Sequence, residues 1–146
     1  MGKDGKFHRP THESRTSSNA WCFGDCFRDP EVHKVEHKIA NIVSRPRRNM
    51  EHFQLLHYTV GQEYQTHHDF IYDQSQLKPQ GARQFTFFLY LNDVTKGGET
   101  YFPELDLTVK PAKGAALLWP NVQYSRNDKQ MHKTTHAALP VLEGAH

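Results

Sequence analysis

The apolar pattern of this chain changes its period partway along, and this change constrains the fold more than any other feature. Before residue 46 the apolar residues recur at helical spacing, whereas from Glu51 onward they alternate in short runs that Gly, Pro and Asn interrupt. A period of two residues puts successive side chains on opposite faces, as a β-strand requires. Many short strands with such turns are typical of antiparallel double-sheet folds. We therefore predict a mainly β fold, a double-stranded β-helix (jelly roll), with one helix packed outside it.

The strands can be placed from the alternation and from the turn residues between the runs. The run 84–91 is rich in aromatic residues and apolar on both faces, which predicts a central strand. Residues 73–83 are polar and predict a loop. The predicted strands cover residues 53–58, 67–70, 84–91, 99–102, 105–109, 114–119 and 132–138.

A helix is predicted from Pro30 onward. Asp29 is a good N-cap residue, proline is favoured at the first helical position, and Pro46 ends the pattern. His33 and His37 lie four residues apart on the polar side, where a solvated face is a simpler interpretation than a zinc pair. The predicted apolar stripe consists of Val32, Val35, Ile39, Ile42 and Val43.

Length and composition indicate one folded domain. A chain of 146 residues with nine Phe, six Tyr and two Trp has enough apolar surface for a core, although its mean hydropathy is −0.79. Residues 1–14 lack periodicity and predict a flexible lead-in, so the domain is expected to cover residues 15–146.

Charge and hydropathy exclude several partners. The net charge of +2, with histidines neutral, is too small and dispersed to indicate nucleic acid. No stretch approaches 18 apolar residues, so no membrane span is expected. The first 18 residues contain no apolar segment of a signal peptide. Cys22 and Cys26 leave three alternatives open, namely a local disulfide, two metal ligands or two free thiols.

His67, Asp69 and His136 are the candidate metal ligands. His67 and Asp69 are one residue apart on a predicted strand, so their side chains share a face while His68 faces the other way. His136 is expected on a second strand that faces the first across the mouth of the barrel. Two imidazoles and one carboxylate form a facial triad, which holds non-haem Fe(II) and leaves positions open for O2 and a co-substrate. The alternative is that His67 is an ordinary surface histidine, since the chain has 11 histidines.

Several stretches of the chain resemble the prolyl 4-hydroxylase family of Fe(II)- and 2-oxoglutarate-dependent dioxygenases. One is the run Tyr-x-x-Gly-Gln-x-Tyr-x-x-His-x-Asp at residues 58–69, and another is Gly-Gly-Glu-Thr-x-Phe-Pro at residues 97–103. The resemblance extends over residues 15–146. Its stretches follow in the family's order at residues 15–22, 51–69, 97–103, 110–114 and 136–144.

This resemblance implies both a site and an activity. His67, Asp69 and His136 match the iron ligands, and Tyr58 and Thr100 match positions that line the 2-oxoglutarate pocket. From the residues alone, Tyr58 is equally well explained as a core tyrosine and Thr100 as an ordinary strand threonine. The implied reaction is 4-hydroxylation of proline in a peptide, with Fe(II), 2-oxoglutarate, O2 and ascorbate. The substrate rests on the resemblance alone.

The chain departs from the family pattern in one residue and at its two ends. The family has a basic residue, usually Lys, ten positions after the distal histidine, where this chain has His146. We expect His146 to contact 2-oxoglutarate, with Arg83 or Lys113 as alternative cations. The portion before Arg15 and the closing strand after residue 146 are missing, so we expect an incomplete domain.

Three other functions therefore remain open. The chain is alternatively a degenerate dioxygenase-fold protein that binds metal or peptide without turnover, a hydroxylase of the same class with another substrate, or a structural jelly-roll module. The resemblance is compatible with the lumen of the endoplasmic reticulum, but the sequence defines neither the compartment nor the oligomeric state.

Overall fold

A computed structural model describes residues 14–72 and 81–145 of the chain. Contacts divide these residues into two compact units. Unit 1 is Ser18–His57, and unit 2 combines residues 14–17 with residues 58–145. Within the described residues, no helix has both the length and the apolarity to cross a membrane.

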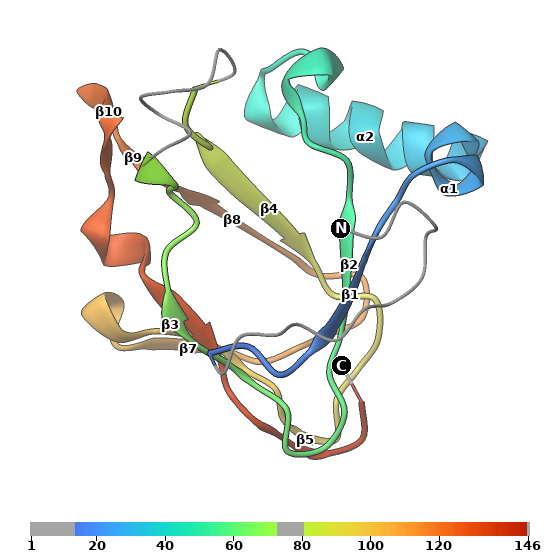
Figure 1. Cartoon of the computed structure of the whole chain (residues 1–146), viewed down its shortest axis with the longest axis vertical. Coiled ribbons are helices and arrows are strands. Elements are labelled where there is room, and N and C mark those ends of the chain that lie inside the picture. Colours follow the sequence, from blue (N-terminus) through green and yellow to red (C-terminus); the bar gives the residue numbers. More distant parts are fainter. Residues whose placement is uncertain (1–13, 73–80, 146) are drawn as a thin grey trace. The chain divides into compact units, whose positions relative to one another are not determined.

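Unit 1 contains a strand pair and the helices (Figure 1). Strands β1 and β2 run antiparallel, with Ser18 opposite His57 and Trp21 opposite Gln54. Strand β2 lies inside the run predicted from residue 53 to 58, whereas β1 was not predicted. The elements of unit 1 are β1 (Ser18–Trp21), α1 (Asp25–Arg28), α2 (Pro30–Val43), a 3-10 turn (Arg47–Asn49) and β2 (Gln54–His57).

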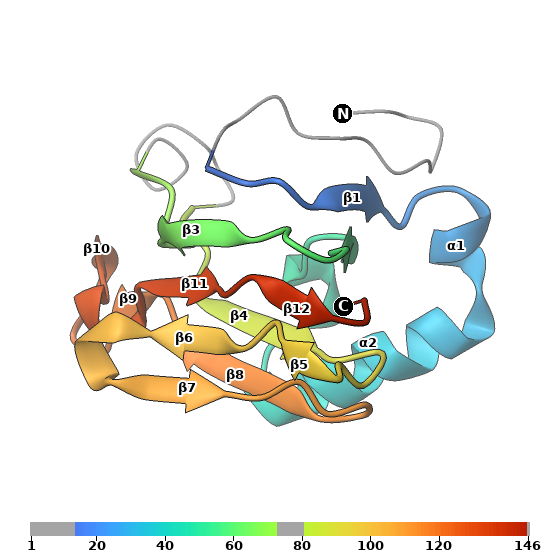
Figure 2. The ribbon, with the colours of Figure 1, turned by 90° about the horizontal axis from the view of Figure 1, so that it is seen from below.

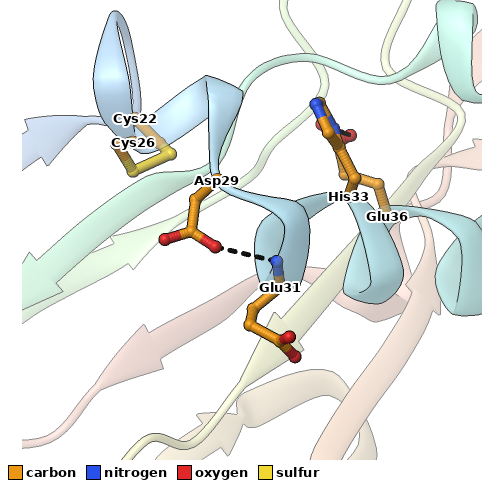
Figure 3. The surroundings of a disulfide bond; sticks show 6 residues. All are labelled: Cys22, Cys26, Asp29, Glu31, His33 and Glu36. Carbon is orange, nitrogen blue, oxygen red and sulfur yellow. Dashed lines mark hydrogen bonds and ion pairs between the residues drawn. A yellow bond between two sulfur atoms is a disulfide. The ribbon is translucent and has the colours of Figure 1, made fainter.

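Helix α2 begins where the sequence predicts. The Asp29 side chain accepts a hydrogen bond from the Glu31 backbone N–H at 2.8 Å (Figure 3), which satisfies one of the N–H groups left free at a helix start. The helix ends at Val43, and Ser44 follows in the left-handed conformation with φ 52°. The end comes before Pro46 because proline disfavours the helical conformation of the residue that precedes it.

The buried face of α2 differs from the predicted apolar stripe. Ile39 is buried, but Ile42 is 60% exposed and Glu36 is only 4% exposed. The Glu36 carboxylate lies 3.0 Å from both His33 Nδ1 and Arg47 Nε, and Figure 3 shows His33 beside it. Ion pairing therefore permits a carboxylate to be buried here. The prediction that His33 and His37 share a solvated face is correct for His37 and wrong for half-buried His33.

Cys22 and Cys26 form a disulfide, which decides between the three alternatives for these residues (Figure 3). The bond joins the segment after β1 to the first turn of α1. Cys22 is buried, and its backbone N–H donates to the Phe53 carbonyl at 2.9 Å. Nearby, the Phe27 ring contacts the His52 ring edge-on, with centroids 4.4 Å apart.

Unit 2 is built from antiparallel strands. The main sheet has four strands in the order β3, β11, β6, β7, which Figure 2 shows side by side. Three further pairs are β4 with β8, β5 with β12, and β9 with β10. The strands are β3 (Tyr64–His67), β4 (Phe85–Leu89), β5 (Lys96–Gly97), β6 (Thr100–Phe102), β7 (Leu107–Val109), β8 (Ala116–Pro120), β9 (Val122–Gln123), β10 (Arg126–Gln130), β11 (His136–Ala138) and β12 (Val141–Glu143), with 3-10 turns at Pro103–Leu105 and His132–Thr134.

Several predicted strands need correction. The run 84–91 forms β4, but within the described residues β4 pairs only with β8, and Phe85 is 43% exposed, so it is not a central strand. The strand predicted at residues 67–70 lies too far along the sequence, because β3 begins at Tyr64 and ends at His67. The run 132–138 begins with a 3-10 turn, and β11 starts only at His136. Strands β5, β9, β10 and β12 were not predicted.

The core of unit 2 is aromatic around Trp119. Trp119 is 5% exposed and meets the Phe102 ring edge-on at 5.4 Å between centroids. The remaining buried apolar residues of unit 2 are Tyr58, Tyr90, Val122, Ala137 and Val141.

Candidate metal centre

Strand pairing brings the two candidate histidine ligands together. His67 is the last residue of β3, and His136 is the first residue of β11. The two are direct partners across the antiparallel pair, and their ring centroids lie 4.3 Å apart. Opposite residues in such a pair have neighbouring side chains, so register alone places the rings side by side.

Asp69 completes a cluster of three ligand atoms. Its Oδ1 lies 3.6 Å from His67 Nε2, and its Oδ2 lies 3.8 Å from His136 Nε2. One ligand atom from each of the three residues lies within 4.8 Å of the others. These distances are too long for hydrogen bonds, so the three groups face a common point without bonding one another.

The elements that bring these three ligands together differ from the prediction in two ways. The ligand-bearing strands are hydrogen-bonded neighbours in one sheet, not strands that face each other across a barrel. Asp69 also lies in a bend after the end of β3, so the alternation of a strand does not explain its direction. The expectation that His67 and Asp69 converge while His68 points elsewhere agrees with the geometry, but the turn after β3 produces it.

Both histidines are held in the tautomer that a metal requires. His67 Nδ1 lies 2.9 Å from the Gln65 carbonyl, and His136 Nδ1 lies 2.9 Å from the Thr134 carbonyl. A carbonyl only accepts, so each Nδ1 carries the proton. Each Nε2 then directs its lone pair toward Asp69. This second hydrogen bond is typical of histidines that bind metals.

Burial favours the neutral form of His67. Burial first, and then the neighbouring His136, lower the pKa of the His67 imidazole from 6.5 to about 4, against the opposing effects of the Gln65 carbonyl and of Asp69. The ring is therefore unprotonated near neutral pH. A neutral imidazole is the form that binds a metal ion.

The other side chains around the cluster fix Asp69 and enclose His136. Thr86 Oγ1 donates to Asp69 Oδ2 at 2.6 Å. The His136 side chain is only 8% exposed, and the Trp119 ring meets it at 4.8 Å between centroids. The cluster thus has a polar wall on the carboxylate side and an aromatic wall on the His136 side.

His68 has a structural role in place of a ligand role. Its Nε2 donates to the Met131 carbonyl at 2.7 Å, and its Nδ1 accepts from the Phe70 backbone N–H at 2.8 Å. These bonds link the turn that carries Asp69 to the segment before β11. His68 therefore holds the two ligand-bearing segments in place.

The predicted 2-oxoglutarate residues lie in different surroundings. Tyr58 is 3% exposed and hydrogen-bonded to Ser17, and burial raises its pKa. Thr100 begins β6 opposite Ala138 of β11, and its Oγ1 lies 2.7 Å from the Tyr90 hydroxyl. His146 lies outside the described residues.

Of the alternative cations, Lys113 is exposed. Arg83 makes interactions of its own. Neither is part of the ligand cluster.

Arg15 is a neighbour of the site to which the sequence interpretation gave no role. Its guanidinium lies over the Tyr64 ring at 5.1 Å, and this ring stacks on His67 at 3.6 Å between centroids. Its Nε donates to Ser17 at 3.0 Å, whereas its Nη2 is buried without a hydrogen-bond partner among the described residues. A buried, unpartnered guanidinium N–H favours an anionic or carbonyl ligand. In the sequence its only signal was its place at the start of residues 15–22, one of the stretches that resemble the family.

These observations fit a ferrous ion. The cluster offers two imidazole nitrogens and one carboxylate, the set that non-haem Fe(II) oxygenases use, and both imidazoles are in the correct tautomer. The residues that would hold the ion are His67, Asp69 and His136.

Comparison with known proteins defines the class of this chain. The sequence pattern of the 2OG-Fe(II) oxygenase superfamily matches residues 53–146. The chain therefore belongs to this superfamily, whose cofactors are Fe(II) and 2-oxoglutarate. The predicted jelly-roll fold class is confirmed.

Within the superfamily, prolyl hydroxylases are among the proteins similar to this chain. The chain is 37% identical over 133 residues to prolyl 4-hydroxylase subunit alpha-2 of Gallus gallus, covering 89% of this chain and 24% of that protein. It is 37% identical over 150 residues to probable prolyl 4-hydroxylase 6 of Arabidopsis thaliana, covering 90% of this chain and 51% of that protein. The resemblance to prolyl 4-hydroxylases noted in the sequence is thus confirmed.

The structure is also similar to a solved viral enzyme. The collagen prolyl hydroxylase of Paramecium bursaria Chlorella virus-1, in its 2OG complex, superposes with a TM-score of 0.75 at 28% identity, over 90% of this chain and 75% of that chain. By contrast, this chain spans between about a quarter and about half of the two curated relatives.

Proposed function

We propose that this chain carries the catalytic centre of an Fe(II)- and 2-oxoglutarate-dependent dioxygenase that hydroxylates proline in a peptide. The observation that carries this proposal is the cluster of His67, Asp69 and His136, with both Nε2 atoms directed at one carboxylate. Similarity to prolyl 4-hydroxylases from an animal and a plant supports proline as the target.

The proposed histidine ligands have the protonation state and the ring orientation for metal binding before any ion binds. The low pKa of His67 keeps its Nε2 free of a proton, and the Thr134 carbonyl holds the His136 ring in place. Trp119 shields the His136 side from water. When bound, iron together with O2 and 2-oxoglutarate supplies the oxidation that converts a C–H bond to C–OH while 2-oxoglutarate becomes succinate and CO2.

Three polar side chains of unit 2 are candidates to bind 2-oxoglutarate. We assign this role to Tyr58 and Thr100, whose hydroxyls are buried and can donate to a carboxylate. Arg15 is a cation whose charge influences both Tyr58 and His67, and its free Nη2 can add a charge-assisted hydrogen bond. His146 stays a prediction for the same role. Ascorbate would act by restoring iron oxidised without turnover.

The proposal is tested by following both products of one reaction. The chain is incubated with Fe(II), 2-oxoglutarate, ascorbate and a proline-rich peptide, and CO2 release is measured together with oxygen gain at proline by mass spectrometry. The expected result is peptide-dependent CO2 release and hydroxyproline, both lost in Asp69→Ala. The same peptide with alanine in place of proline serves as the matched substrate control.

Each other outcome identifies which part of the proposal is wrong. Decarboxylation with no oxygen on proline would contradict the substrate but keep the class of reaction. Fe(II) binding with no decarboxylation, even at high 2-oxoglutarate, would favour the alternative of a metal-binding protein without turnover.

A further inference from the structure

The Asp69 carboxylate is the first group in a hydrogen-bonded series of three side chains, which come from three separate segments. Thr86 lies on β4, directly opposite Trp119 of β8, and Asn121 follows the end of β8. Thr86 Oγ1 donates to Asp69 Oδ2 at 2.6 Å, and Asn121 Nδ2 donates to Thr86 Oγ1 at 2.9 Å. The chain of hydrogen bonds therefore runs from Asn121 through Thr86 to Asp69.

The direction of these bonds follows from the chemistry of the groups. An ionised carboxylate only accepts hydrogen bonds, so the single hydroxyl proton of Thr86 must point to Asp69. The oxygen of Thr86 must then accept from its other neighbour, and only the amide nitrogen of Asn121 can donate. This requirement fixes the orientation of the Asn121 amide.

Asn121 is held rigidly enough to act as an anchor. Its side chain is fully buried, its backbone N–H donates to the Gln84 carbonyl at 2.9 Å, and its carbonyl accepts from the Met131 N–H at 2.9 Å. Its Oδ1 is buried without a hydrogen-bond partner among the described residues. Burial of an amide oxygen without a hydrogen-bond partner is unfavourable for folding. This cost indicates that the bond from Asn121 to Thr86 serves the site.

We propose that Thr86, anchored by Asn121, is a positioning residue that holds Asp69 so that it offers one oxygen to the metal. This inference rests on the metal centre of the proposed function. Oδ2 accepts the strong, short bond from Thr86, which draws on its electron density and makes Oδ1, 3.6 Å from His67 Nε2, the better ligand atom. A carboxylate held through one oxygen leaves more positions on the ion for co-substrate and O2 than one that binds through both.

The test uses metal binding without turnover. Thr86→Val keeps the shape of the side chain and removes the hydroxyl, whereas Thr86→Ser keeps the hydroxyl. Affinity is measured with Mn(II) alone, and ligand geometry is followed in the absorption spectrum of the Co(II)-loaded protein. We expect Thr86→Val to lose about tenfold or more in Mn(II) affinity and to change the Co(II) spectrum, with Thr86→Ser close to the unmodified chain.

Asn121→Leu shows whether the anchor acts through Thr86. It should weaken Mn(II) binding in the unmodified chain and have little further effect when Thr86 is already valine, because its only bond to the site passes through the hydroxyl. The melting temperature of each metal-free variant establishes that it is folded. If Thr86→Val does not fold, Asn121→Leu alone decides.

Two results would overturn the inference. One is Thr86→Val, or Asn121→Leu in its place, with unchanged Mn(II) affinity and an unchanged Co(II) spectrum. The other is a loss in Thr86→Ser as large as that in Thr86→Val, which would indicate packing and not the hydroxyl. Failure of the unmodified chain to release CO2 while these metal effects persist would contradict the proposed function only.

Discussion

Gly97 is the position where the structure predicts the largest effect of a single added methyl group. Its φ is +79°, and it lies opposite Val141 in the pairing of β5 with β12. A Cβ placed on Gly97 would lie 2.3 Å from the Pro140 carbonyl oxygen and 2.6 Å from the Leu142 nitrogen, both backbone atoms that cannot move aside alone. Gly97→Ala should therefore separate β5 from β12.

Gly114 provides a matched control for the size of this effect. Its φ is +83°, but a Cβ there would meet nothing within 4 Å. Gly114→Ala thus has only the left-handed backbone strain, about 1–2 kcal/mol. Gly97→Ala adds the loss of about one hydrogen bond, near 1 kcal/mol, and partial exposure of the fully buried Val141, about 1–3 kcal/mol. The excess over the control is about 2–4 kcal/mol.

The assay is urea unfolding of the two variants beside the unmodified chain, with melting temperatures as a second measurement. The excess corresponds to a melting temperature roughly 5–15 °C below that of Gly114→Ala. Because β6 and β11 adjoin these strands in the sequence, Gly97→Ala should also weaken metal binding at His136. Equal stability of the two variants would refute the packing argument.

Three further predictions follow from other contacts. His67→Ala should abolish Fe(II) binding, whereas His68→Ala should lower thermal stability and weaken metal binding much less. Equal loss of binding in both variants would contradict the assignment of His67 and not His68 as the ligand. In the metal-free protein the pKa of His67 is lowered from 6.5 to about 4, so between these pH values the unfolded chain takes up a proton that the folded chain does not. The free energy of unfolding should therefore fall as the pH drops from about 6.5 to 4. His67→Gln should flatten this part of the curve of stability against pH, measured by urea denaturation, and an unchanged curve would be contrary evidence. Cys26→Ser should lower the free energy of unfolding by about 2 kcal/mol, because the disulfide closes only a short loop between Cys22 and Cys26. A variant as stable as the unmodified chain in the same denaturation assay would show that the disulfide does not stabilise unit 1.

The parts of the fold that local rules determine could be predicted from the sequence. The start of α2 is specified by Asp29 and Pro30, whose side chains act on the backbone next to them. The class of fold followed from alternation. The short strand β12 could not be found in this way. Its three residues carry no strand pattern of their own, and they form a strand because Val141 pairs with Gly97.

The candidate site shows the same division between local and long-range causes. Residue types and the short spacing indicated His67 and Asp69, but the bend that turns Asp69 and the register that sets His136 opposite His67 depend on distant segments. Thr86 and Asn121 carried no sequence signal at all, since a threonine in a strand and an asparagine after one are common. Burial of Glu36 was likewise hidden, because it depends on ion pairs with His33 and Arg47.

Anaerobic Fe(II) titration is the sharpest test of whether His67, Asp69 and His136 together hold one ferrous ion. We expect one equivalent of tightly bound Fe(II) per chain, with no tight binding in Asp69→Ala or His136→Ala although both variants remain folded. Tight binding of Fe(II) by either variant, at the affinity of the unmodified chain, would show that the ion is held elsewhere.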